Sequence, residues 1–150
     1  MSLSTVTDST CLIGLERIQR LDILSQVFSP VIIPPAVQTE VGISASWITV
    51  QAPRSIMTVA ALKTQLDDGE AEAIALALEL NDVFIILDDL SARRVAKQLN
   101  LKVMGTVGML LRAKQQKVID EIKPLLTALN TADFRVSEAI IQNALRLAGE

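Results

Sequence analysis

Short apolar runs and longer helical patterns alternate along this 150-residue chain. The short runs are rich in β-branched residues, and most are followed by apolar residues spaced three or four apart, as on one face of a helix. Strands are predicted over residues 4–7, 31–33, 47–50, 83–87 and 101–104. This alternation is typical of an α/β fold with a parallel sheet. The uninterrupted apolar run 83–87 is predicted to be the central strand, covered on both faces.

Helical spacing predicts the segments between these strands. Apolar residues from Ile13 to Val27 indicate a first helix with a break near Gly14. Pro34 and Pro35 close the second strand and open the next helix, because the φ of proline suits a first helical turn. Further helices are predicted over residues 59–66, 70–80, 92–99, 105–117, 119–129 and 137–148. No repeat, linker or charge block divides the chain, so we expect a single domain over residues 1–150.

Composition excludes several classes of function. One cysteine and no histidine exclude a disulfide framework, a multi-thiolate zinc site and imidazole catalysis. A net charge of −3 and an aromatic content of 3% argue against broad attraction to nucleic acid and against a base-stacking platform. No apolar run approaches the roughly 20 residues of a membrane helix, and the first ten residues lack a signal-peptide pattern. We therefore expect a cytoplasmic protein without a membrane partner.

Six acidic residues carry the candidate chemistry, and they stand where predicted strands end or helices begin. They are Asp8, Glu40, Glu70, Glu72, Asp88 and Asp89. The carboxyl ends of parallel strands meet at one edge of a sheet, where ligands bind, so these acids are expected to gather there. Glu70 and Glu72 are two residues apart and face different sides of one helix. Glu70 continues an apolar stripe, which makes it the better candidate for an inward carboxylate.

Carboxylates without imidazole favour binding of Mg²⁺ or Mn²⁺. Carboxylates that share a pocket raise each other's pKa, and a bound cation offsets that cost. Two such ions about 4 Å apart can activate a water and stabilise the leaving oxygen of a phosphodiester. Each acid also has a structural interpretation. Asp8 and Asp89 suit helix N-caps, and Glu70 suits a first helical turn. Glu40 and Glu72 suit ordinary surface charges.

Two weaker features lie near the acids. The segment Gly105-Thr106-Val107-Gly108 is similar to a phosphate-binding turn but lacks the Walker lysine. A tight turn before a helix is the alternative, with Thr106 as a contributor to the site. Arg93, Arg94 and Lys97 follow the acidic pair within about two helical turns. One of these arginines is expected to contact substrate phosphate, and the alternative is a solvated helix face.

The order and spacing of these segments resemble the PIN domain, and more narrowly its prokaryotic subgroup of VapC-like ribonuclease toxins. The matching segments are Asp8-Ser9, Ile33-Pro34-Pro35-Ala36-Val37 with Glu40, Gly69-Glu70-Ala71-Glu72-Ala73-Ile74-Ala75-Leu76-Ala77, Leu87-Asp88-Asp89 with Arg93, and Gly105-Thr106. The resemblance runs from about Asp8 to the end of the chain. It implies a central parallel sheet of four to five strands sandwiched by helices in three layers, α/β/α.

The resemblance also implies a nuclease site that depends on Mg²⁺ or Mn²⁺. The acids carried over are, in order, Asp8, Glu40, one of Glu70 and Glu72, and one of Asp88 and Asp89. Glu70 and Asp88 are the expected catalytic members of their pairs. The expected substrate-binding residues are Ser9, Arg93 and Thr106. The usual third acid of the family is an aspartate, whereas the glutamate here reaches one methylene further.

The leading hypothesis is therefore a metal-dependent endoribonuclease in which a metal-bound water hydrolyses RNA and leaves a 5′-phosphate. The resemblance implies a small antitoxin protein and a second copy of the chain as partners. One alternative is a catalytically weak or inactive PIN-like module that acts through protein interaction, which the glutamate at the third position and the acidic net charge favour. Another is a receiver or phosphatase domain, although no clear pair of acceptor aspartate and lysine stands out.

Overall fold

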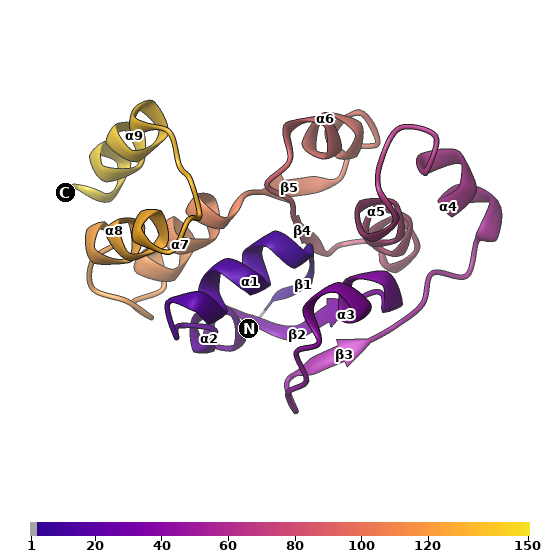
Figure 1. The fold of residues 1–150 in the computed structure, drawn as a ribbon, viewed down its shortest axis with the longest axis horizontal. Helices are drawn as coiled ribbons and strands as arrows, with labels where there is room; N and C mark the ends of the chain where they lie inside the picture. Colours follow the sequence, from indigo (N-terminus) through magenta and orange to yellow (C-terminus); the bar gives the residue numbers. More distant parts are fainter. Residues whose placement is uncertain (1–2) are drawn as a thin grey trace.

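The computed structural model describes residues 3–150, and a five-stranded parallel sheet forms its centre (Figure 1). The strands are β1 Leu3–Thr7, β2 Phe28–Ile33, β3 Ile48–Val50, β4 Phe84–Ile86 and β5 Lys102–Met104. Their order is β3-β2-β1-β4-β5, and every neighbouring pair is parallel. This arrangement confirms the predicted α/β fold.

The centre of the sheet is occupied by β1, so the prediction that residues 83–87 form the central strand is wrong. An uninterrupted apolar run indicates a strand that is buried on both of its faces. β4 is buried in this way, although it is not the middle strand of the sheet. Ile86 packs into one core cluster, and Ile85 and Leu87 pack into the other. The weakly patterned β1 pairs with β2 on one side and with β4 on the other.

Nine helices are present among the described residues. They are α1 Ser9–Arg17, α2 Asp22–Val27, α3 Pro35–Val41, α4 Ile56–Leu62, α5 Asp68–Leu80, α6 Leu90–Gln98, α7 Thr106–Gln115, α8 Lys123–Thr131 and α9 Glu138–Ala148. The predicted break near Gly14 is misplaced: Gly14 is buried inside α1, and the chain leaves the helix after Arg17, with Gln19 in the left-handed region at φ 58°. The helix predicted from residue 119 begins at Lys123.

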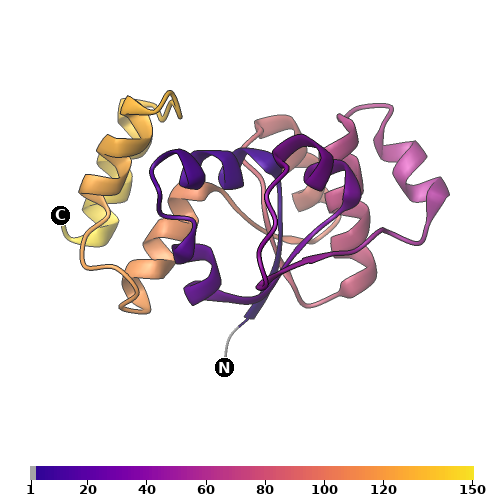
Figure 2. The same ribbon diagram turned by 60° about the horizontal axis from the view of Figure 1, so that its bottom comes forward.

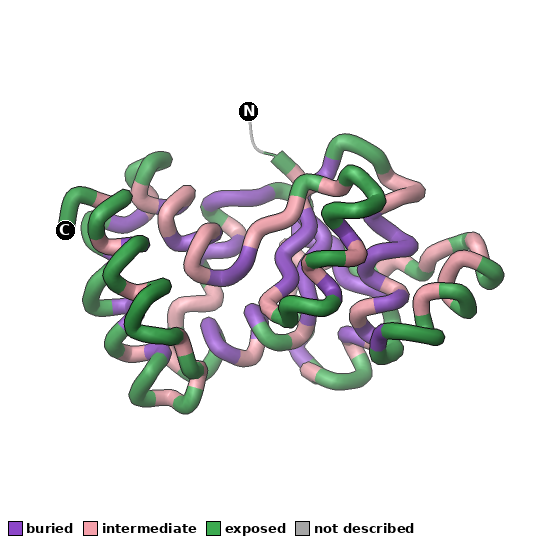
Figure 3. Tube along the Cα trace, turned by 90° about the horizontal axis from the view of Figure 1, so that it is seen from above, coloured by how far each residue is buried: buried purple, intermediate pink, exposed green. Residues whose placement is uncertain are grey.

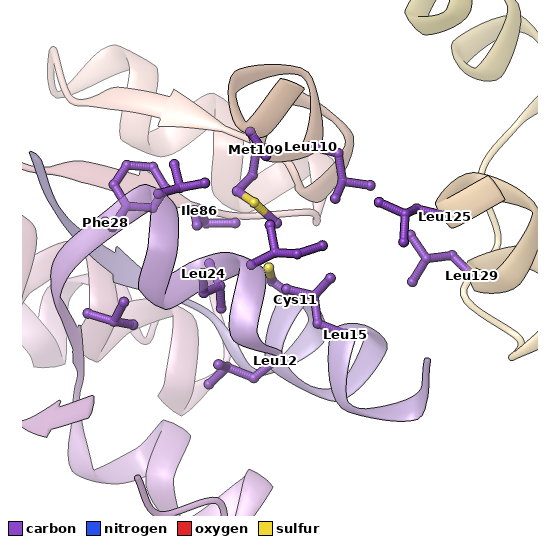
Figure 4. Close-up of a cluster of buried hydrophobic side chains, with 14 of the residues drawn as sticks. Cys11, Leu12, Leu15, Leu24, Phe28, Ile86, Met109, Leu110, Leu125 and Leu129 are labelled. Carbon is purple, nitrogen blue, oxygen red and sulfur yellow. The ribbon is translucent and has the colours of Figure 1, made fainter. Parts of the chain in front are cut away.

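Helices cover both faces of the sheet, and each face has its own apolar cluster (Figures 2 and 3). Alternate residues of β2 divide between the clusters: Val31 and Ile33 belong to the first, and Ile32 belongs to the second. The first cluster joins α1, α2, α7 and α8 (Figure 4). The second joins α5 and α6 to the opposite face. The three-layer α/β/α arrangement follows from this period-two division of the strands.

The two ends of the molecule are helical. One end carries α8 and α9, and the other carries α4 (Figure 2). The Glu150 side chain accepts hydrogen bonds from the backbone N–H groups of Ile122 and Lys123 and from Lys114 Nζ, which ties the end of α9 to α7 and α8. No helix among residues 3–150 has the length and apolar character that crossing a membrane requires.

Candidate functional site

Two aspartates meet at the carboxyl edge of the sheet, where the neighbouring strands β1 and β4 end. Asp8 directly follows β1 and is the N-cap of α1. The backbone N–H of Cys11 donates to Asp8 Oδ1 at 3.0 Å, and the backbone N–H of Asp88 donates to Asp8 Oδ2 at 3.0 Å. One buried carboxylate therefore caps a helix and also holds the loop that carries the second aspartate.

Asp88 is oriented by the turn between β5 and α7. Thr106 donates to it twice, from the backbone N–H to Oδ1 at 2.9 Å and from Oγ1 to Oδ2 at 2.6 Å. A Cβ on Gly105 would lie 3.1 Å from Asp88 Oδ1 and 3.2 Å from Arg93 Nη1. A methyl group at Gly105 would therefore press on both side chains, which would have to move by a few tenths of an ångström. The φ of −93° does not itself require glycine. The turn is thus a tight helix start that places Thr106 on Asp88, as one of the two interpretations predicts.

Glu40 and Glu70 form a second acidic group beside Asp8. Ser9 Oγ, on the residue after Asp8, donates to Glu40 Oε2 at 2.8 Å. The charge of Glu70 acts on Asp8 and adds to the rise of its pKa. Gly69 packs under Glu40, since a Cβ there would lie 2.7 Å from Glu40 Oε1. Partial burial raises the pKa of Glu70, and the charges of Asp67, Asp89 and Glu40 add to that rise. The negative charge of Glu70 therefore interacts with the negative charges of these three acids.

Asp67 is the acid that the sequence interpretation missed. It is the N-cap of α5 and forms a capping box with Glu70: the Glu70 N–H donates to Asp67 Oδ1, and the Asp67 N–H donates to Glu70 Oε1. The spacing D-x-x-E before an apolar helix is the sequence signal of that motif. Glu70 is therefore both a first-turn cap and a member of the acidic group.

The remaining two acids cap helices. The Ala36 N–H donates to Glu72 Oε1 at 3.1 Å, so Glu72 serves the start of α3. Asp89 is the N-cap of α6 and accepts from the Ala92 N–H at 2.9 Å. A capping residue can also belong to the site, because Asp8 is the N-cap of α1 and also contacts Asp88. Among residues 3–150, however, no three acidic or cysteine side chains converge closely enough to form a ready-made metal cage.

Burial and charge act together on Asp8. Burial is the larger cause and the charge of Asp88 the next, and they raise the pKa of Asp8 from 3.8 to about 7, against the lowering effect of its two N–H donors. A carboxylate with this pKa is only partly ionised near neutral pH, and a cation at the site would favour its charged form. The pair Asp8 and Asp88 is the strongest electrostatic feature of this edge.

Arg93 is the basic residue that reaches this edge. Its Nη1 lies beside Gly105, and together with Asp88 it lines one groove. Its Nε is buried without a hydrogen-bond partner among the described residues. Arg94, the next residue of α6, is exposed. Of the two arginines predicted to follow the acidic pair, Arg93 therefore lies beside Asp88, and Arg94 is exposed to solvent.

A family model described as a PIN domain matches residues 4–150. The chain belongs to the PIN-domain family. No curated protein matches this PIN domain. Among solved structures it is similar to a PilT N-terminus domain protein from the hyperthermophilic archaeon Sulfolobus solfataricus P2, with 17% sequence identity, a TM-score of 0.48, and coverage of 74% of this chain and 93% of that chain.

The match to the PIN-domain family confirms the family that the sequence segments resemble. It excludes the alternative of a receiver or phosphatase domain. PIN domains are generally nucleases, and PIN-domain nucleases typically use divalent metals. The donor set of this PIN domain fits a hard cation. The carboxylates of Asp8 and Asp88 lie next to each other at this edge. Mg²⁺ prefers oxygen ligands and is usually bound by one or two carboxylates with water in several of its remaining positions. Asp8 and Asp88 supply that number.

Proposed function

We propose that this PIN domain is an endoribonuclease that depends on Mg²⁺ or Mn²⁺ and hydrolyses RNA phosphodiesters. The observation that carries the proposal is the adjacency of Asp8 and Asp88, joined by the hydrogen bond from the Asp88 N–H to Asp8 Oδ2. The raised pKa of Asp8 adds support, because a buried carboxylate beside a second, half-buried carboxylate is costly to keep ionised without a cation. Membership of a nuclease family supports the reaction class.

Asp8 and Asp88 would hold the cation, with Glu40 and Glu70 positioned to bind its water ligands. A bound divalent cation supplies a water of lowered pKa and stabilises the leaving oxygen. Thr106 keeps both oxygens of Asp88 in one orientation, and Ser9 holds Glu40 through a hydrogen bond. Arg93, beside Asp88, would bind the phosphate that is cut. Glu72 and Asp89 remain predicted metal ligands of lower priority, since each already caps a helix.

Cleavage of single-stranded RNA with and without EDTA tests the reaction. The wild-type protein is expected to cut with Mg²⁺ or Mn²⁺ and to stop in EDTA, and Asp8→Asn is expected to lose activity under both conditions. Asp120→Asn, which removes an exposed aspartate outside the site, is the matched control and should cut like the wild type. Cleavage that persists in EDTA, or full activity of Asp8→Asn, would contradict the proposal.

A catalytically weak PIN module that acts through protein interaction is the second candidate. It is favoured by the lack of a converged three-acid group among residues 3–150 and by the glutamate at the third position. Titration calorimetry with Mn²⁺ separates the two candidates. A nuclease site is expected to bind Mn²⁺ with loss of binding in Asp8→Asn, whereas no heat at millimolar Mn²⁺ would favour the interaction module.

The predicted homodimer finds support in α4. None of its residues, all of which the structure describes, is buried, and Ile56 and Met57 are 83% and 84% exposed. Large apolar side chains grouped on one helix favour a protein interface. Light scattering after gel filtration is expected to give a dimer that Met57→Glu converts to a monomer. Leu147→Glu, on exposed α9 at the other end, is the control. The antitoxin partner, the VapC-like subgroup and the cytoplasmic location remain predictions.

A further inference from the structure

The helix α9, at one end of the molecule, buries little of its surface (Figure 2). Of its residues, all of which the structure describes, Ala144 is the one that is buried. Ile141, Leu145 and Ala148 pack against the first core cluster but stay partly exposed. Its neighbours α7 and α8 each bury three or more residues. Elements with few buried apolar contacts open at a lower free energy than the core, so α9 is expected to open first.

Two charged side chains supply the hydrogen bonds that hold α9 in place. Glu150 Oε2 accepts from the Ile122 N–H at 2.8 Å and from Lys114 Nζ at 2.9 Å. Its Oε1 accepts from the Lys123 N–H at 3.1 Å. Lys114 Nζ also donates to the Ala148 carbonyl at 2.6 Å. Among the described residues, every hydrogen bond that joins α9 and the two residues after it to another helix involves one of these two side chains, which we call the latch.

The latch joins α9 to the start of α8. Ile122 is the N-cap of α8 and its side chain makes no cap hydrogen bond, so the Glu150 carboxylate pairs N–H groups that a helix start leaves without partners. The helix α9 ends at Gly149, whose φ is 75°, and the Glu150 N–H donates to the Leu145 carbonyl at 2.8 Å. This Schellman-type end fixes the backbone of Glu150. The Glu150 side chain is 10% exposed, so its charge-assisted hydrogen bonds are largely shielded from water.

The chain is anchored just before α9 begins. A Cβ on Gly14 would lie 2.5 Å from Phe134 Cδ2, so the ring packs directly on the backbone of α1. Arg17 Nη1 also donates to the Ala132 carbonyl at 3.2 Å. Residues 136–137 join this anchor to α9. Because the anchor depends on α1 and not on the latch, α9 can turn about residues 136–137 while the chain before them keeps its place.

The position of α9 affects the groove of about 810 Å³ that Asp88 lines. Ile140, in the first turn of α9, lines the same groove and is 51% exposed. Figure 1 shows that α9 and β4, which precedes Asp88, are far apart in the sequence. Turning α9 away from α7 would take Ile140 out of the wall and widen the groove that leads to the acidic edge.

We propose that α9 is a hinged flap on this groove, and that the latch of Glu150 and Lys114 sets the fraction of molecules in which the flap is open. In the closed form Ile140 stands in the groove wall. In the open form α9 leaves α7, while the sheet, α1 and α8 stay folded. The inference goes beyond the proposed nuclease function and does not depend on it, because the opening is a property of the fold.

Thiol labelling with DTNB tests the flap. Ala144→Cys places a thiol on the buried side of α9, and Cys11, the single natural cysteine, is fully buried in the first core cluster and reports opening of the core. Adding Glu150→Gln or Lys114→Met is expected to speed labelling of the introduced thiol by about tenfold or more, because charged hydrogen bonds are lost. Labelling of Cys11 should stay unchanged. Glu121→Gln, which makes the same charge change on an exposed side chain outside the latch, is the matched control.

The double variant Glu150→Gln/Lys114→Met separates a shared latch from two independent contacts. Its acceleration should be smaller than the product of the two single accelerations, because each substitution already breaks the bond between them. Hydrogen exchange followed by mass spectrometry makes the same test without an introduced thiol. In Glu150→Gln the amides of α9 should exchange faster than in the wild type, and those of α1 and the sheet should not.

Two results would overturn the proposal. Unchanged labelling and exchange of α9 in both Glu150→Gln and Lys114→Met would show that these side chains do not hold it. Equal acceleration at Cys11 and at the introduced thiol would show that the whole core opens and that α9 does not move as a flap. A wild-type protein that fails to cut RNA would count against the nuclease function and would leave these rates as they are.

Discussion

Replacing Asp8 with asparagine is expected to remove much of the pH dependence of stability of the metal-free protein between pH 5 and pH 8. The pKa of Asp8 is raised from 3.8 to about 7, first by burial and then by the charge of Asp88. The folded protein therefore binds this proton more tightly than the unfolded chain does. The resulting stabilisation is fully present below pH 3.8 and is lost as the pH rises through about 7.

The size of the effect follows from these two values. Between pH 5 and pH 8 the contribution of Asp8 to the free energy of unfolding falls by about 2.5 kcal/mol. Asparagine has no proton to lose in this range. It does lose a hydrogen bond at every pH, because its single oxygen cannot accept from both the Cys11 and Asp88 N–H groups, at a cost of about 1–3 kcal/mol. At pH 5 the free energy of unfolding of Asp8→Asn should be lower than that of the wild type. This difference should become smaller toward pH 8.

Urea unfolding in EDTA at pH 5, 6, 7 and 8 measures this difference. Fluorescence of Trp47, the single tryptophan, reports unfolding because its ring packs against the first core cluster. Asp120→Asn should follow the wild-type pH dependence. Millimolar Mg²⁺ at pH 8 should raise the midpoint of the wild type but not that of Asp8→Asn. Parallel curves of unfolding free energy against pH for the wild type and Asp8→Asn would refute the reasoning. They would show that Asp8 has the same pKa in the folded protein and in the unfolded chain.

Three further substitutions probe the site and the core. Gly105→Ala should lower RNA cleavage at least about tenfold with little change in Tm, because the methyl would displace Asp88 and Arg93; unchanged cleavage would contradict this role of Gly105. Thr106→Val removes the hydroxyl bond to Asp88 and should cost about 1–2 kcal/mol in urea unfolding, whereas Thr106→Ser should not. Leu24→Ala, in the buried first cluster, should cost about 2–5 kcal/mol, against less than about 0.5 kcal/mol for the exposed Leu147→Ala.

The position of Asp8 and Asp88 at the carboxyl edge of the sheet was predictable from the sequence. It depends on where each strand ends and on the rule that parallel strands end at the same edge. Asp8 directly follows β1, and Asp88 comes two residues after the end of β4. The direct contact between Asp8 and Asp88 depends on strand order, which places β1 beside β4. That order is decided by packing across the whole sheet, so residue spacing could not reveal which acids would touch.

Other details escaped prediction for similar reasons. Gly14 reads as a helix break by its intrinsic propensity, but Phe134, distant in sequence, supplies the packing that keeps it inside α1. The caps Asp8, Asp89 and Glu70 were foreseen as alternatives, and each is a cap in the fold.

The hydrogen bond between Asp88 and Asp8 spans 80 residues of chain, and this separation bears on how the protein is synthesised. A ribosome releases Asp8, Ser9 and Glu40 well before Asp88 and Thr106. The nascent N-terminal half can pair β1 with β2 and β2 with β3, yet the other edge of β1 stays open until β4 emerges. A chain that stops before β4 carries four of the six candidate acids but lacks Asp88, so it cannot assemble the pair. The pair of Asp8 and Asp88 therefore cannot form until more than half of the protein has been synthesised.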